Sequence, residues 1–71
     1  MRNRDELIYD LIFSDKEEFI IDIGEYTDIY KYDYFMDDMK EILKKSKVKI
    51  ILSSLDVNSK TVTWEIKLKR Q

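Results

Sequence analysis

The sequence contains no cysteine, no histidine and no proline, and its single glycine is Gly24. Without cysteine, neither a disulfide nor a thiolate metal site can form, and this absence fits a reducing compartment. Without histidine, the chain lacks the commonest metal ligand and the usual general base at neutral pH. One glycine cannot build a glycine-rich loop for binding phosphate groups.

Catalysis finds little support in the residues that are present. The serines have no histidine to activate them as nucleophiles. Paired carboxylates could support acid–base chemistry, but a chain of 71 residues has little material left to build an enclosing cleft. We therefore expect a binding protein that is not an enzyme and that carries no cofactor.

Long hydrophobic runs are also missing. No apolar stretch approaches the roughly 20 residues that cross a bilayer, and residues 1–6 are too charged to lead a signal peptide. We expect a cytoplasmic protein that makes no membrane contact. Alanine is absent, whereas ten isoleucines and ten lysines indicate AT-rich coding. Such a composition is typical of low-GC bacteria, their phages and mobile elements, which encode many small regulators and inhibitors.

The length indicates one small domain that spans residues 1–71. A domain of this size buries a modest fraction of its surface, so its stability is marginal. With no disulfide to staple the fold, binding to a partner or to a second copy would add stability. The sequence therefore does not decide between a monomer and a homodimer.

The apolar spacing predicts two helices. The first is expected over residues 4–13, with Asn3 as its N-cap. Its apolar face consists of Leu7, Ile8, Leu11 and Ile12. The second is expected to begin near Asp33, although residues 25–33 fit a strand, a loop or an early start of this helix. Its apolar face consists of Phe35, Met36, Met39, Ile42 and Leu43.

Alternating apolar residues predict three strands. Residues 18–23 form the first and end at Gly24, a natural turn point. The other two belong to a C-terminal hairpin whose turn lies near Asn58. Their inward residues are expected to be Val48, Ile50 and Leu52 on one strand and Val62, Trp64, Ile66 and Leu68 on the other.

The register of the hairpin follows from burial. A three-residue loop at 57–59 would pair Leu52 with Trp64 and place the large apolar groups on one face, with Ile51 and Leu55 on the opposite face. A two-residue loop would place Ser53 opposite Trp64 instead. We expect the first arrangement. Trp64, Met36 and Met39 are predicted to belong to the core.

These elements predict the α+β class, with two helices on one face of a small antiparallel sheet. The order is α-β-(β)-α-β-β, with three strands, or four if residues 25–33 contribute one. The order of the strands in space does not follow from the sequence.

Charge is divided unevenly along the chain. Residues 1–43 hold thirteen acids and five bases, whereas residues 44–71 hold eight bases and two acids. In the acidic part, carboxylates alternate with tyrosines, which combine a large contact area with a polar tip. We expect this segment to bind a host protein, by imitating nucleic-acid charge if that protein handles nucleic acids. The candidate partner-binding residues are Asp22, Glu25, Tyr26, Asp28, Tyr30, Asp33, Tyr34, Asp37, Asp38 and Glu41.

The charged side chains also fit roles that do not involve a protein partner. Acids near a helix N-terminus are ordinary helix design, and a charged face keeps a helix soluble. A metal site made from Asp37, Asp38 and Glu41 is not expected, because adjacent carboxylates point in different directions. Lysines on the hairpin either keep an edge strand soluble or bind nucleic acid directly. The candidate residues for this alternative are Lys47, Lys49, Lys67, Lys69 and Arg70.

Overall fold

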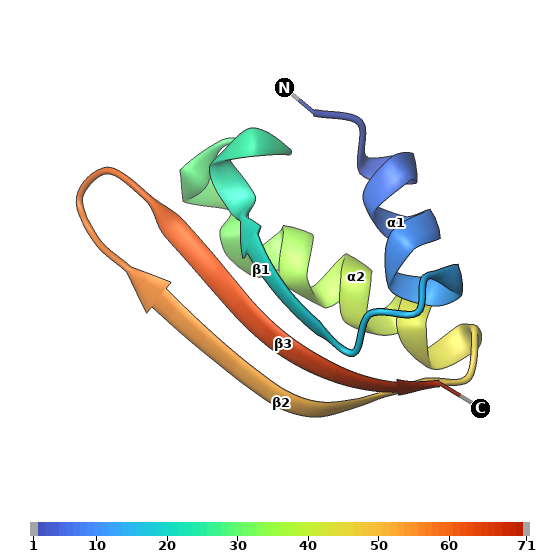
Figure 1. Ribbon diagram of the computed structural model, residues 1–71. Helices are drawn as coiled ribbons and strands as arrows, with labels where there is room; N and C mark the ends of the chain where they lie inside the picture. Colours follow the sequence, from blue (N-terminus) through green and yellow to red (C-terminus); the bar gives the residue numbers. More distant parts are fainter. Residues whose placement is uncertain (1, 71) are drawn as a thin grey trace.

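The computed structural model describes residues 2–70, which form a three-stranded antiparallel sheet with two helices packed on one of its faces (Figure 1). Two short 3-10 turns, η1 and η2, join the first strand to the second helix. The predicted α+β class and the C-terminal hairpin are confirmed. In chain order, the elements are α1 (Arg4–Phe13), β1 (Glu18–Asp22), η1 (Ile23–Glu25), η2 (Ile29–Lys31), α2 (Tyr32–Lys45), β2 (Val48–Val57) and β3 (Val62–Arg70).

Helix α1 begins and ends as the sequence predicts. The Asn3 side chain caps it by accepting a hydrogen bond from the Asp5 backbone N–H at 2.8 Å. Asp5 and Glu6 lie in the first turn, where the helix dipole favours negative charge. Leu7 and Leu11 lie one turn apart and are buried, so α1 presents one apolar stripe to the sheet.

The segment between β1 and α2 contains no strand within the described residues, so the sheet has three strands. The Asp22 carboxylate caps η1 by accepting a hydrogen bond from the Gly24 N–H at 3.1 Å. Gly24 does not adopt a positive φ. A glycine is favoured at this position because neighbouring side chains pack closely against its Cα. A Cβ at this position would lie 3.1 Å from the Cγ2 atom of Ile29, which is tighter than ordinary van der Waals contact.

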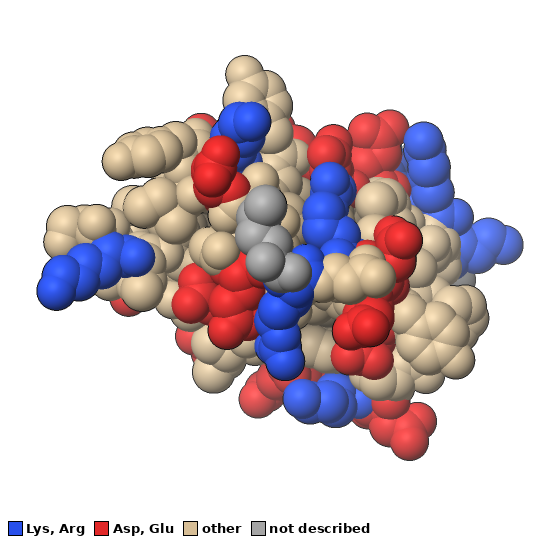
Figure 2. All heavy atoms as spheres, turned by 90° about the horizontal axis from the view of Figure 1, so that it is seen from above, with Lys and Arg blue, Asp and Glu red and all other residues tan. Residues whose placement is uncertain are grey.

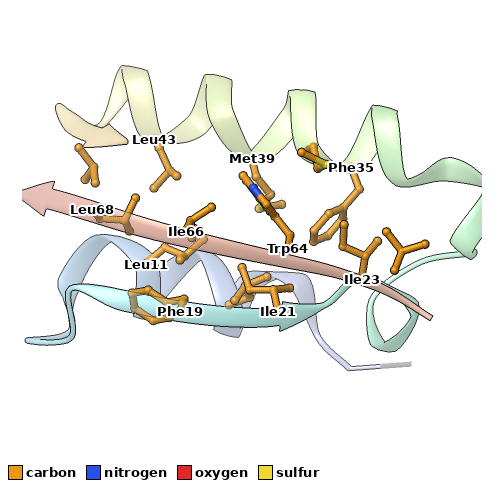
Figure 3. Close-up of a cluster of buried hydrophobic side chains, with 14 residues drawn as sticks. Leu11, Phe19, Ile21, Ile23, Phe35, Met39, Leu43, Trp64, Ile66 and Leu68 are labelled. Carbon is orange, nitrogen blue, oxygen red and sulfur yellow. The ribbon is translucent and has the colours of Figure 1, made fainter. Parts of the chain in front are cut away.

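The core lies between the sheet and the helices, and Figure 3 shows its side chains converging from α1, α2, β1 and β3. Trp64 is fully buried in the first half of β3, which is the middle strand of the order β1-β3-β2. Met36 and Met39 are also buried, as predicted. The buried set is Leu7, Leu11, Phe19, Ile21, Ile23, Phe35, Met36, Met39, Leu43, Val48, Val62, Trp64, Ile66 and Leu68.

The hairpin register differs from both predicted alternatives. Trp64 pairs with Leu55, not with Leu52 or Ser53. Ser53 pairs with Ile66, and a bulge between Ile50 and Leu52 shifts the register of the strand. Leu55 therefore lies on the same face of the sheet as Trp64, contrary to the prediction that it faces away from the core.

Two local interactions explain this register. Asn58 closes a four-residue loop at 58–61, where its Oδ1 atom accepts hydrogen bonds from the backbone N–H groups of Lys60 and Thr61 at 2.9 and 2.8 Å. Ser53 satisfies the buried indole, because its Oγ atom accepts a hydrogen bond from Trp64 Nε1 at 2.8 Å. A buried N–H without an acceptor is costly, so a serine at this position is favoured over a larger apolar residue.

Arg70 joins the end of β3 to the end of α1. Its guanidinium donates hydrogen bonds to the backbone carbonyl oxygens of Leu11 and Lys16, and it has further contacts with the Asp10 carbonyl and the Ser14 Oγ at 3.4 Å. The carbonyls of Asp10 and Leu11 lie in the last turn of α1, where the negative end of the helix dipole favours a cation, and the carbonyl of Lys16 lies three residues beyond the helix. Arg70 thus closes the fold between its first helix and its last strand.

The helices cover only part of the sheet. The hairpin tip projects beyond α2 in Figure 1, and β2 forms one edge of the sheet. Along β2, only Val48 is fully buried, and Ile51, Leu52 and Val57 are about half exposed. Within residues 2–70, no helix has the length and apolar character needed to cross a membrane.

Replacing Arg70 with methionine should lower the free energy of unfolding by about 2 kcal/mol, because several carbonyl acceptors lose a charged donor. Urea unfolding, followed by the fluorescence of the single tryptophan, measures this loss. Lys69→Met is the matched control, since Lys69 is exposed and its replacement should change stability by no more than about 0.5 kcal/mol. Equal effects of the two substitutions would contradict the proposed role of Arg70.

Candidate protein-binding surface

The outward side of α2 carries a regular row of carboxylates. Asp33, Asp37 and Glu41 recur every four residues, so they lie on one side of the helix, roughly 6 Å apart along its axis. All three are exposed, whereas Phe35, Met36, Met39 and Leu43 face the sheet. The predicted ladder opposite the apolar face is therefore present.

Two tyrosines stand beside this row. Tyr30, in η2, is 91% exposed, and Tyr34, in the first turn of α2, is 75% exposed. Helical spacing places Tyr34 next to Asp37 and Asp38, three and four residues further along. We use the name acidic tyrosine surface for the group formed by Tyr30, Asp33, Tyr34, Asp37, Asp38 and Glu41.

Neighbouring bases neutralise part of this surface. Asp38 contacts Arg4 of α1 at 3.6 Å, and Glu41 contacts Lys45 at 3.5 Å. Both pairs are solvent exposed, so their contribution to stability is small and a competing cation can replace them. Within residues 2–70, Asp33 and Asp37 take part in no ion pair.

The other four predicted residues precede α2: Asp22 ends β1, and Glu25, Tyr26 and Asp28 lie between β1 and α2. Tyr26 is half buried and stacks on Phe35 with ring centroids 5.9 Å apart, so it supports the core. Asp22 caps η1, and exposed Asp28 precedes η2. Glu25 contacts Arg2 at 3.2 Å, and this carboxylate raises the pKa of the Arg2 guanidinium above its ordinary value.

Seen from above, acidic and basic side chains are intermixed (Figure 2). The carboxylates form several separate groups with lysines and arginines between them, not one continuous acidic face. Among residues 2–70, no three acidic side chains converge closely enough to hold a metal ion.

A second group of exposed aromatics lies on α1, at positions that the sequence pattern did not single out. Tyr9 and Phe13 are 64% and 67% exposed, and their ring centroids lie 5.0 Å apart. Acidic residues adjoin Tyr9, where Asp5, Glu6 and Asp10 line a shallow hollow with it. The available signal was the four-residue spacing of Tyr9 and Phe13 on the side opposite Leu11.

Two members of the alternative lysine surface, Lys67 and Arg70, make contacts within the fold. Arg70 is engaged with the end of α1, and Lys67 contacts Glu18 of β1 at 3.6 Å. Lys49 and Lys69 lie directly opposite each other on β2 and β3. The only tryptophan, Trp64, is buried and cannot stack on a base.

A groove between α2 and β2 brings together lysines that are not grouped by their spacing in the sequence. It has a volume of about 790 Å³ and an open, partly apolar surface. Lys47 reaches it from the turn after α2, where its φ of 62° is left-handed. The groove is lined by Lys40, Lys44, Lys47, Val48, Lys49, Ile50 and Ser53.

Comparison with protein-family models, with curated proteins and with solved structures finds no match to this chain.

Proposed function

We propose that this protein is a non-enzymatic regulator or inhibitor that binds another protein through the acidic tyrosine surface. The observation that carries the proposal is the position of Tyr34, which is 75% exposed beside the carboxylates of α2. Exposed tyrosines lose little conformational entropy on binding and dominate many protein interfaces. Tyr30 precedes Tyr34 by four residues and offers a second contact of the same kind.

The partner's surface should be basic. Asp33 and Asp37 lack an internal cation within residues 2–70, so an arginine or lysine of a partner can pair with them without first breaking an ion pair. The exposed pairs of Asp38 and Glu41 exchange at small cost. A row of carboxylates at regular spacing also resembles the phosphates of a nucleic acid in its charge.

We further propose that the partner is a host protein that handles nucleic acids and that this surface occupies its basic groove. A phage or mobile element would be the source of such an inhibitor, in keeping with the AT-rich coding of the chain. Electrostatic attraction of this kind accelerates the encounter and weakens as salt is added. An excess of DNA should therefore displace the protein from its partner.

Reversing three charges, with Asp33, Asp37 and Glu41 all changed to Lys, should abolish partner binding. The test is affinity capture from a low-GC bacterial lysate, with isotope-labelled wild-type and variant baits compared by mass spectrometry. The relevant partner is retained by the wild type, lost with the variant and eluted by excess DNA. Circular dichroism should show that the variant is folded, since all three positions are exposed.

The matched control is a second triple reversal in which Asp15, Glu17 and Glu65 are changed to Lys. It alters net charge by the same amount at exposed positions outside the acidic tyrosine surface. The control should retain the partner. If every captured protein survives the α2 reversal, or is lost equally with both variants, the proposed surface is wrong.

Replacing Tyr34 with alanine should weaken binding at least about tenfold, since a central tyrosine of an interface contributes about 2 kcal/mol. Titration calorimetry with the purified partner measures the change. Tyr9→Ala, at a tyrosine on α1 that is also largely exposed, is the control and should leave the affinity within about twofold. A larger loss for Tyr9 than for Tyr34 would move the interface to α1.

Direct binding of nucleic acid is the second candidate, and the lysine-lined groove between α2 and β2 favours it. Fluorescence anisotropy with labelled single- and double-stranded DNA and RNA at about 20 mM salt distinguishes the two functions. A protein-binding regulator should show no saturable signal there. Affinity that falls steeply with salt and is lost in a variant with Lys47 and Lys49 changed to Glu would instead support nucleic-acid binding.

A further inference from the structure

Strand β2 is an unusually long free edge. It spans ten residues and, in the described part of the chain, pairs on one side only, with β3. Natural edge strands are commonly short or protected by charge, because their free N–H and C=O groups attract another strand. The charges of Lys47 and Lys49 lie only at or just before the start of β2. The run from Ile50 to Leu55 has no charged residue. Four apolar side chains remain exposed along it: Ile51 (55%), Leu52 (50%), Leu55 (37%) and Val57 (51%).

The bulge determines which side chains of β2 share a face. Lys49 pairs with Lys69 and Asp56 pairs with Thr63, and both partners lie on the face of β3 that points away from the helices. Ile50, Ser53 and Leu55 pair with buried residues of β3, so they lie on the helix-covered face. Without the one-residue shift at the bulge, Lys49 and Asp56 would lie on opposite faces, because they are an odd number of positions apart, seven, along the strand.

We propose that a second copy of this chain occupies the edge, with the two β2 strands paired antiparallel about a two-fold axis at Ser53. A symmetric dimer brings the same surface of both copies together, so each contact occurs twice. In this register the bulged pair, Ile51 and Leu52, faces the partner's Ser54. The two sheets then form one continuous six-stranded sheet.

This register matches the pattern of β2 with itself. Ile50 lies opposite the partner's Leu55, and Val48 lies opposite the partner's Val57. The partner's Leu55 and Val57 thereby enter the groove between α2 and β2, whose floor is formed by Val48, Ile50 and Ser53. The groove lies beside the C-terminal half of α2, where Lys40 and Lys44 flank it, and here Ile50 is partly exposed and Ser53 is exposed.

Charge supports the same register. Lys49 lies opposite the partner's Asp56 on the outer face, and the symmetry produces this pair twice. Opposite charges at facing positions stabilise paired strands, whereas like charges there destabilise them. Moving the axis one place toward the hairpin tip would put Lys49 opposite the partner's Asn58. Moving it one place the other way would bring the two bulges face to face.

The first test is the mass in solution of charge-reversed variants. Sedimentation equilibrium over a wide concentration range should give twice the chain mass of 8.7 kDa for the wild type. Asp56→Lys and Lys49→Asp should each weaken self-association at least tenfold, and the double variant K49D/D56K should restore it. Asp37→Lys, which makes the same charge change on α2, should leave the dimer intact.

The second test uses the absence of cysteine from the chain. In Ser53→Cys, the only thiols face each other across the axis at a separation that a disulfide spans, so mild oxidation should give a covalent dimer. In Ser54→Cys, the two thiols lie too far apart, and cross-linking should be at least tenfold slower. Equal cross-linking of the two variants overturns the register at Ser53.

A wild-type protein that stays monomeric at millimolar concentration overturns the dimer itself. A dimer that withstands both single charge reversals overturns its placement on β2. Binding of another protein through α2 is a separate property, because Asp37→Lys probes that surface without touching the strand edge. Recovery of the dimer in the double charge swap distinguishes loss of the interface from loss of folding, which a single reversal alone would not.

Discussion

Strand β3 holds the fold together because, among the strands of residues 2–70, it alone has neighbours on both sides, β1 and β2. Its inward residues Val62, Trp64, Ile66 and Leu68 are all buried, and they meet the apolar stripe of α2 and the two buried leucines of α1. Trp64 is central in this layer, since its ring fills the core while its N–H finds an acceptor in Ser53. The positions of the two outer strands and both helices depend on contacts to this single strand.

Much of this arrangement could be predicted from the sequence, because periodic apolar residues and one good cap determine helices and strands locally. The bounds of α1, the start of β1 and the buried residues of β3 follow from such patterns. The hairpin register did not, because the prediction placed Leu52 on the buried face of β2 and Leu55 on the opposite face, whereas Leu55 pairs with Trp64. Leu52 and Val57 are half exposed, and a serine occupies the position beside the indole. A bulge leaves no periodic signal.

The candidate site was predictable to the extent that it depends on one helix. The four-residue spacing of Asp33, Asp37 and Glu41 identifies their common side. The orientation of Tyr26, however, depends on its stacking against Phe35 of α2. Arg70 could not be placed by alternation along β3, since its partners lie 54 to 60 residues earlier in the chain. Contacts between distant residues determine which charges remain free for a partner.

The central position of β3 has a consequence for how the protein is made. β1 pairs with β3 alone, yet 39 residues of chain separate the end of the one from the start of the other. During synthesis, β1 therefore leaves the ribosome without a strand to pair with. Both helices likewise emerge before β3, the strand whose inward residues they pack against. The native structure can close only after the last strand has emerged, so a ribosome that stalls within β3 would hold an unfolded chain with its apolar residues open to chaperones and proteases.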